Sequence, residues 1–171
     1  MCLLTNSSFT INRGQTLNRV CPLFYEMEEN YMEITANAIQ LVEQGQNIQF
    51  TETAVRSCKP CVIHREGSGI TTLRGITNQC NARFLVTFSG NIAIPTGGTI
   101  EEISLAIAID GEPLQSTRMR VTPAAVNNYF NVSAQAFVNV PRGCCVTVAV
   151  ENTSAQAINV QNANLIVTRE A

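Results

Sequence analysis

The sequence has few charged residues and no tryptophan. Aspartate, glutamate, lysine and arginine make up 14% of the 171 residues, whereas about a quarter is usual for globular proteins. The net charge is −2, so the chain lacks the basic surface that nucleic-acid binding requires. Sugar sites usually contain exposed aromatic rings with a polar group. Without tryptophan, only Tyr25, Tyr31 and Tyr129 have such a ring, which weakens the case for a glycan partner.

Long apolar runs are missing as well. The longest, ISLAIAI at 103–109, is far shorter than the roughly 20 residues of a membrane-spanning helix. The first residues, MCLLTNSSF, have no positively charged region before their short apolar run and do not resemble a secretory signal. We therefore expect synthesis in the cytoplasm without a signal peptide, and no membrane insertion.

Apolar residues alternate with small or polar ones through most of residues 82–167. Phe84, Val86 and Phe88 share one face of an expected strand, and Asp110-Gly111 is a hairpin signal that pairs 103–109 with 113–121. Turn signals recur about every 8 to 14 residues, without a long helical pattern. The sequence predicts an all-β fold for 31–171, a two-sheet antiparallel sandwich of jelly-roll type.

Residues 1–30 do not follow this pattern and are predicted to form an N-terminal arm. Residues 7–11 could form a short strand within it. The arm contains too many apolar residues for a solvated tail. We expect it to pack on the domain, on a neighbouring subunit or on other proteins of the same particle.

Several segments together resemble a known family. In order they are ARFLVTFSGNIAIP, SLAIAIDGEPL, YFNVSAQAFVNVPRGCCVTVAVENTS and NANLIVTR. This order is similar to the tumour-necrosis-factor-like and complement-globular-head-like jelly rolls of bacterial and phage surface proteins, such as the C-terminal domains of collagen-like spore glycoproteins. The resemblance spans about residues 46–169 and implies a ten-strand jelly roll that trimerises through one face.

The strand expected at 103–109 suggests where subunits meet. One face carries large aliphatic residues, and the other carries Ser104, Ala106 and Ala108, which are small enough for another sheet or subunit to approach closely. Tyr129 and Phe130 complete the candidate interface.

Cysteines are the main candidates for chemistry. Cys58 and Cys61 have the spacing of a zinc-binding pair, and His64 and Cys80 could complete four ligands. A disulfide or plain thiols are the alternatives, because seven cysteines in a cytosol are expected to be mostly reduced. Cys144 and Cys145 are adjacent on an expected strand, so one should face the core and the other the surface.

No arrangement of residues indicates catalysis or a cofactor. His64 is the only histidine, and Gly67-Ser68-Gly69 lacks the strand and helix of a nucleophile elbow. Together with the resemblance, and because the chain has an N-terminal arm in place of a Gly-X-Y collagen stem, this leads us to expect a non-enzymatic structural protein, a homotrimeric jelly roll on a phage virion as a capsid decoration or fibre component. The alternative is a carbohydrate- or receptor-binding module on a bacterial spore or cell surface.

Overall fold

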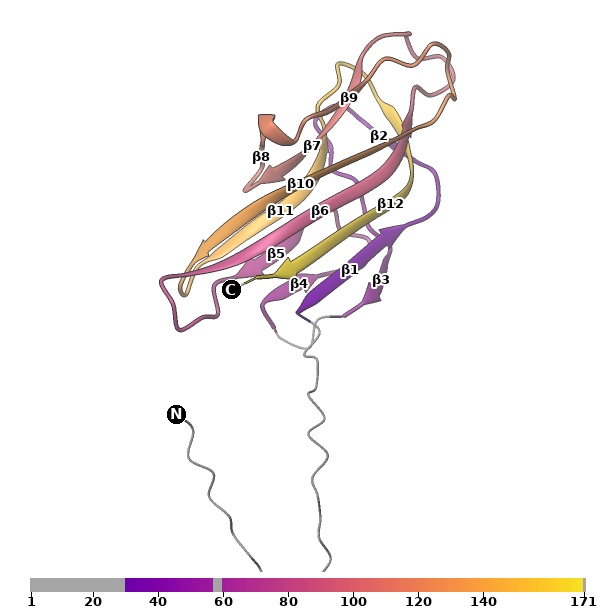
Figure 1. Ribbon diagram of the computed structural model, residues 1–171. Helices are drawn as coiled ribbons and strands as arrows, with labels where there is room; N and C mark the ends of the chain where they lie inside the picture. Colours follow the sequence, from indigo (N-terminus) through magenta and orange to yellow (C-terminus); the bar gives the residue numbers. More distant parts are fainter. Residues whose placement is uncertain (1–29, 57–59, 171) are drawn as a thin grey trace, which may run out of the picture.

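The computed structural model describes residues 30–56 and 60–170. Two antiparallel sheets pack face to face (Figure 1). In order across the first sheet lie β10 (Phe130–Pro141), β6 (Asn81–Ala93), β12 (Ile158–Arg169), β1 (Tyr31–Ala36) and β3 (Glu52–Val55), with β2 (Gln40–Val42) also paired to β12. In order across the second lie β4 (Val62–His64), β5 (Thr71–Arg74), β11 (Cys145–Asn152), β7 (Ile103–Ile109) and β8 (Glu112–Pro113), with β9 (Met119–Val121) also paired to β7.

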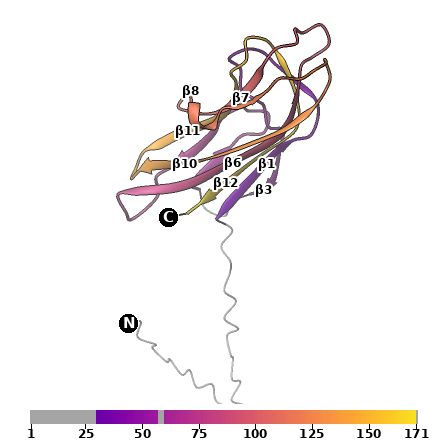
Figure 2. The same ribbon diagram turned by 45° about the horizontal axis from the view of Figure 1, so that its top comes forward.

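The alternation in the sequence places the core between the sheets. Phe84, Val86 and Phe88 of β6 are 0% exposed, as are Leu73 and Ile107 of the second sheet. The two sheets remain stacked when the molecule is turned (Figure 2). The all-β jelly-roll sandwich is therefore confirmed, because each sheet buries the alternate apolar residues of its strands against the other.

The predicted hairpin at Asp110-Gly111 is present. Both residues have positive φ, 50° and 85°, as a tight two-residue turn between antiparallel strands requires. The returning segment does not form the single strand expected at 113–121. It pairs with β7 first as β8 and then as β9, and the 3₁₀ turn η1 (Gln115–Thr117) separates the two.

Alternation in the sequence also predicts two short strands at 158–160 and 165–167 and one strand at 47–55, and the structure differs in both places. The two short strands expected near the C-terminus are one strand, β12, whose register with β6 shifts between Gln161 and Asn164. Asn162 has a φ of 52° at this irregularity. Of the strand expected at 47–55, only β3 forms, and Asn47 and Phe50 make isolated bridges.

The described part of the chain contains no helix that is long and apolar enough to cross a membrane.

Candidate interaction surface

The outer surface of the first sheet carries one charged residue, Arg83, across its three longest strands, and the rows beyond Arg83 are uncharged. On β10, β6 and β12, the residues opposite to the core alternate with the buried ones. We call this set the neutral face: Asn131, Ser133, Gln135, Phe137, Leu85, Thr87, Ser89, Asn91, Gln161, Asn164, Ile166 and Thr168. None of these twelve residues is charged, and the nearest charges are at the margin, where Arg83 lies over Phe137 and Glu33 accepts a hydrogen bond from Asn164. A second protein surface could therefore cover the middle of the face without desolvating an ion.

Strand register arranges the neutral face in rows. One row runs Phe137, Leu85 and Thr168, and the next runs Gln135, Thr87 and Ile166. The apolar members of the face therefore lie together toward one end of the sheet. Amide and hydroxyl residues fill the other end, where Asn131 Nδ2 donates to Asn91 Oδ1 over 3.1 Å.

Phe137 is the most exposed large apolar side chain of the described residues, at 63%. The Arg83 guanidinium lies 6.0 Å from the centre of its ring and also donates to Asn139 Oδ1 over 3.2 Å. A single exposed apolar residue is ordinary on a protein surface. Here the ring adjoins Leu85 and the Ile166 row, with Arg83 as the one charge beside it, which makes the patch suitable for contact with another protein.

Asn164 lies within the neutral face and has an unused acceptor. Its Nδ2 donates to Glu33 Oε1 over 2.7 Å, which fixes the orientation of the amide. Its Oδ1 is buried and has no hydrogen-bond partner. Buried polar atoms are nearly always paired, so this oxygen is an exception within the neutral face.

Phe137 and Asn164 carry no distinctive signal in the sequence. In the segment that forms β10, every second residue from Phe130 to Val140 is apolar, and the residues between them include the β10 members of the neutral face. Only the absence of charge on those alternate positions could have drawn attention to them.

Ser104, Ala106 and Ala108 lie on the outer side of β7, and each is 1% exposed within the single chain. Arg118 lies across Ser104, since its Nε donates to Ser104 Oγ over 3.1 Å and its Nη2 donates to Thr153 O over 3.0 Å. A neighbouring subunit would thus contact the flanking side chains before it reached these small ones. Their role at an interface stays a prediction.

Tyr129 and Phe130 are half-buried at the start of β10. Phe130 pairs with Ile92 and belongs to the row next to that of Asn131 and Asn91. Phe130 therefore faces the core side of the sheet, opposite to the neutral face, and Tyr129 precedes β10 at the end of that face. Their part in an interface also stays a prediction.

The structure separates the candidate zinc ligands into different environments. Cys61 is buried and Cys80 is exposed, both as free thiols, and Cys58 lies outside the described residues. His64 Nε2 is 3.3 Å from Phe50 O and its Nδ1 is 3.3 Å from Thr71 Oγ1, so both ring nitrogens already have partners. Within 30–56 and 60–170, no three His, Cys, Asp or Glu side chains gather as metal ligands would.

The expectation for Cys144 and Cys145 is wrong. Both are exposed free thiols. Cys144 belongs to a turn, where its N–H donates to Pro141 O over 3.0 Å. The rule of opposite faces does not apply, because only Cys145 belongs to β11.

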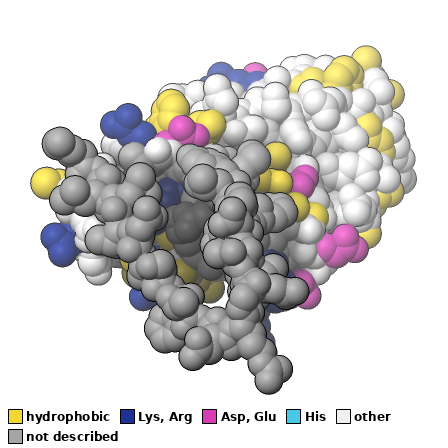
Figure 3. Space-filling model, turned by 60° about the horizontal axis from the view of Figure 1, so that its bottom comes forward, with side chains coloured by type: hydrophobic (Ala, Val, Ile, Leu, Met, Phe, Trp, Pro, Cys, Tyr) yellow, Lys and Arg dark blue, Asp and Glu magenta, His cyan; other side chains and the backbone are white. Residues whose placement is uncertain are grey.

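Seen from the end where β1 begins and β12 stops, much of the visible described surface is neither apolar nor charged (Figure 3). This agrees with the low charge content of the sequence. The predicted arm, except for Asn30, lies outside the described residues.

The comparisons with known proteins address the fold. No family model and no curated protein matches the chain. Among solved structures, it is similar to a TNF protein, Eiger, from S. frugiperda, with a TM-score of 0.63 and 11% identity over 82% of this chain and 92% of that one. It is also similar to the globular domain of the zebrafish complement 1qA protein, with a TM-score of 0.57 and 11% identity over 82% and 96% of the two chains.

A third similar structure is murine APRIL at pH 5.0, with a TM-score of 0.55 and 9% identity over 81% of this chain and 98% of that one. Identities this low concern the fold alone. The chain has the jelly-roll fold of tumour-necrosis-factor-like and complement-globular-head domains.

Proposed function

We propose that this protein is a non-enzymatic structural jelly roll that associates into a homotrimer through the neutral face. The trimer is the state that the resemblance implies. We further propose that it forms part of the surface of a phage virion, as a capsid decoration or fibre component.

The neutral face is the observation that carries this proposal. Its three strands are long, its twelve outward residues include no charge, and Phe137 is 63% exposed at one end. Interfaces are depleted in charge at their centre and enriched in aromatic residues. A neighbouring subunit would cover Phe137, Leu85 and Ile166.

Asn164 supports the same surface through its polar chemistry. An unpaired buried oxygen costs about 1–3 kcal/mol. A donor from a second subunit would remove this cost, and a surface that stayed in water would need no such oxygen to be enclosed. We keep Tyr129 and Phe130 as candidate contact residues at the end of the sheet where β10 begins.

Light scattering of the full chain tests the association. We expect a mass of about three times the 18.6 kDa of one chain at micromolar concentration. Phe137→Asp should lower the mass toward that of one chain, because it places a charge where a partner excludes water.

The matched control is Ile100→Asp, which puts the same charge on a side chain of similar exposure, 57%, in a loop away from the neutral face. This variant should keep the trimer. A monomeric mass for the unchanged chain would contradict the proposal.

The location is tested separately. Mass spectrometry of purified phage particles should find the chain in stoichiometric amounts with the other virion proteins. Its recovery from spores or cell surfaces instead would contradict the virion assignment and leave the association untouched.

A further inference from the structure

β10 ends the first sheet with an unprotected edge. It is twelve residues long, and among the described strands it pairs only with β6. The free N–H and C=O groups of such an edge can pair with another chain, and proteins usually guard them with charge, proline or short length. From Phe130 to Val140 there is no charged residue and no proline.

The other strands that end the two sheet orders differ from β10. They are two to four residues long, and each carries an ionisable side chain: Glu52 in β3, His64 in β4 and Glu112 in β8. The missing protection is therefore particular to β10, and it suggests that this edge is normally occupied.

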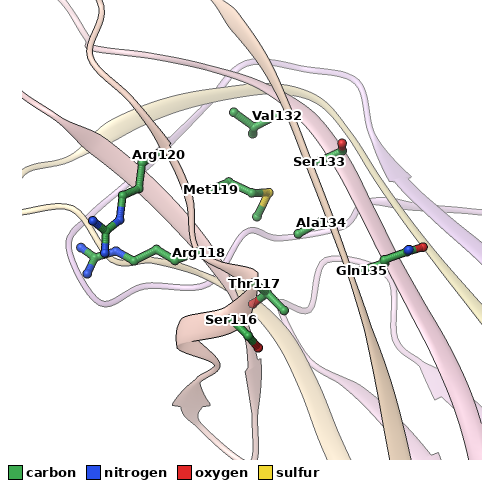
Figure 4. Close-up of a pocket in the computed structure, with 9 residues that line it drawn as sticks. All are labelled: Ser116, Thr117, Arg118, Met119, Arg120, Val132, Ser133, Ala134 and Gln135. Carbon is green, nitrogen blue, oxygen red and sulfur yellow. The ribbon is translucent and has the colours of Figure 1, made fainter.

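A cavity of about 370 Å³ adjoins this edge. It lies between β10 residues 132–135 and residues 116–120 of η1 and β9 (Figure 4). Most of its lining residues are polar, and its apolar part consists of Met119, Val132 and Ala134. Arg118 and Arg120 point away from β10 (Figure 4). Val132 and Ala134 face the core side but are only half-buried, so the core is open to a further apolar side chain here.

We propose that residues 7–11 of this chain, SSFTI, add to β10 as a further antiparallel or parallel strand. In an extended segment, Phe9 and Ile11 share one side, and Ser8 and Thr10 share the other. This repeats the alternation of β10, where Val132 and Ala134 are on the core side of the sheet and Ser133 and Gln135 are on the outer side. Phe9 and Ile11 would pack on the apolar part of the cavity, against Met119, Val132 and Ala134, and the two hydroxyl residues would extend the neutral face.

The length of chain before β1 is sufficient. Tyr31 and Phe137 lie in one row, three strand spacings apart through Thr168 and Leu85, which is about 14 Å. The 20 residues from Ile11 to Tyr31 reach about 65 Å when extended. The segment can therefore reach the edge of its own β10 or that of a neighbouring copy.

A second β10 is a less suitable occupant. It would bring its own η1 and β9 to the same edge, since residues 116–120 flank the cavity in every copy. A single strand needs room for one chain only.

Amide hydrogen exchange of the full chain tests the proposal. Alternate N–H groups of β10 bond to β6, and the others point to the free edge. In the unchanged chain, the edge-pointing amides among residues 132–135 should exchange slowly. Phe9→Asp with Ile11→Asp should raise their exchange rate about tenfold or more, because the added strand no longer protects them. Ser8→Asp with Thr10→Asp is the matched control, with the same charge in the same segment on the outward side, and should leave the rate unchanged.

Amides of residues 86–88 in β6 report whether the domain stays folded, and they should exchange alike in all three proteins. Equally fast exchange of the edge-pointing amides among residues 132–135 in the unchanged chain and in the Phe9→Asp, Ile11→Asp variant would overturn the proposal. Slow exchange in all three would overturn it too, because a different strand, such as a second β10, would then cover the edge. The readout is local protection, so it does not depend on the mass measured for the proposed trimer.

Discussion

Asn152 donates its side-chain amide to Val42 O over 2.9 Å, and this bond joins β11 of one sheet to β2 of the other. The same amide donates to Gln156 O over 2.9 Å, and its Oδ1 accepts from the Ser154 N–H over 2.9 Å. Asn152 is 0% exposed. One side chain therefore satisfies three backbone groups, two in the turn that follows β11 and one at the end of β2.

Replacing Asn152 should destabilise the domain strongly. Asn152→Ala leaves three backbone groups without this partner, and we expect a loss of about 3 kcal/mol in the free energy of unfolding. Asn152→Asp should cost more, because it turns a carboxylate oxygen toward two carbonyl oxygens. Urea denaturation measures both, with the exposed Asn139→Ala as a control that should stay within about 0.5 kcal/mol.

The Asp110-Gly111 turn should be sensitive to side chains at its second position. Gly111 has a φ of 85°, which a residue with a Cβ adopts only under strain, so Gly111→Ala should cost about 1 kcal/mol. Glu112→Ala, one residue along the same hairpin, should change stability by less than about 0.5 kcal/mol. Thermal unfolding compares the two, and equal midpoints would show that the turn tolerates strain.

The side-chain carboxylate of Asp110 should stabilise the domain through its hydrogen bonds to Thr147. Its Oδ1 accepts from Thr147 N over 2.8 Å and from Thr147 Oγ1 over 3.1 Å. Asp110→Asn keeps an acceptor and tolerates the positive φ of 50°, whereas Asp110→Ala keeps neither advantage. The alanine variant should unfold at lower urea concentration than the asparagine variant, and the reverse order would contradict the role of this bond.

Gly75 is expected to reject any side chain. It is buried, its N–H donates to Cys144 O over 2.8 Å, and a Cβ here would fall on the carbonyl oxygen of Pro141. Gly75→Ala should therefore cost about 3 kcal/mol through displaced backbone. Ile76→Ala changes an exposed neighbour and is the control. Similar denaturation midpoints for the two variants would show that the turn after β10 moves freely.

Glu151 should make the domain less stable as the pH rises. Burial raises the pKa of its carboxyl above the ordinary value of 4.5, and the Glu112 carboxylate raises it further. The folded chain then holds this proton more tightly than the unfolded chain, so the free energy of unfolding falls as the pH rises from 4.5 through the raised pKa. Glu151→Gln removes this contribution.

The measurement compares unfolding midpoints of the unchanged chain and Glu151→Gln at about pH 4 and about pH 8, on either side of the shifted titration. The midpoint of the variant relative to the unchanged chain should be higher at the upper pH than at the lower. Glu112→Gln should act in the same direction by removing the neighbouring charge. A difference that does not depend on pH would contradict the shifted pKa.

Much of the fold could be predicted because its signals are local. Alternation in β6 and the positive-φ turn at Asp110-Gly111 depend on neighbours in sequence. The interruption between β8 and β9 was not predictable in the same way, since it depends on how η1 fits beside β7: Thr117 Oγ1 accepts from Ile107 N over 3.0 Å.

The candidate surface was less accessible to sequence reasoning. The large and small sides of β7 suggested an interface, but Ser104 and its small neighbours are covered by the chain itself. Whether a small residue is open or covered depends on residues distant in sequence, here Arg118 and Thr153.

The sequence alone determined the two-sheet architecture, its main turns and the low charge of its surface, because strand alternation and turn chemistry act over a few residues. Only the tertiary structure decided which neutral residues lie side by side. Phe137, Leu85 and Thr168 are 31 or more positions apart in the chain and meet because long-range pairing sets the register of β10, β6 and β12. The same pairing leaves the far edge of β10 open, and no local pattern could show that.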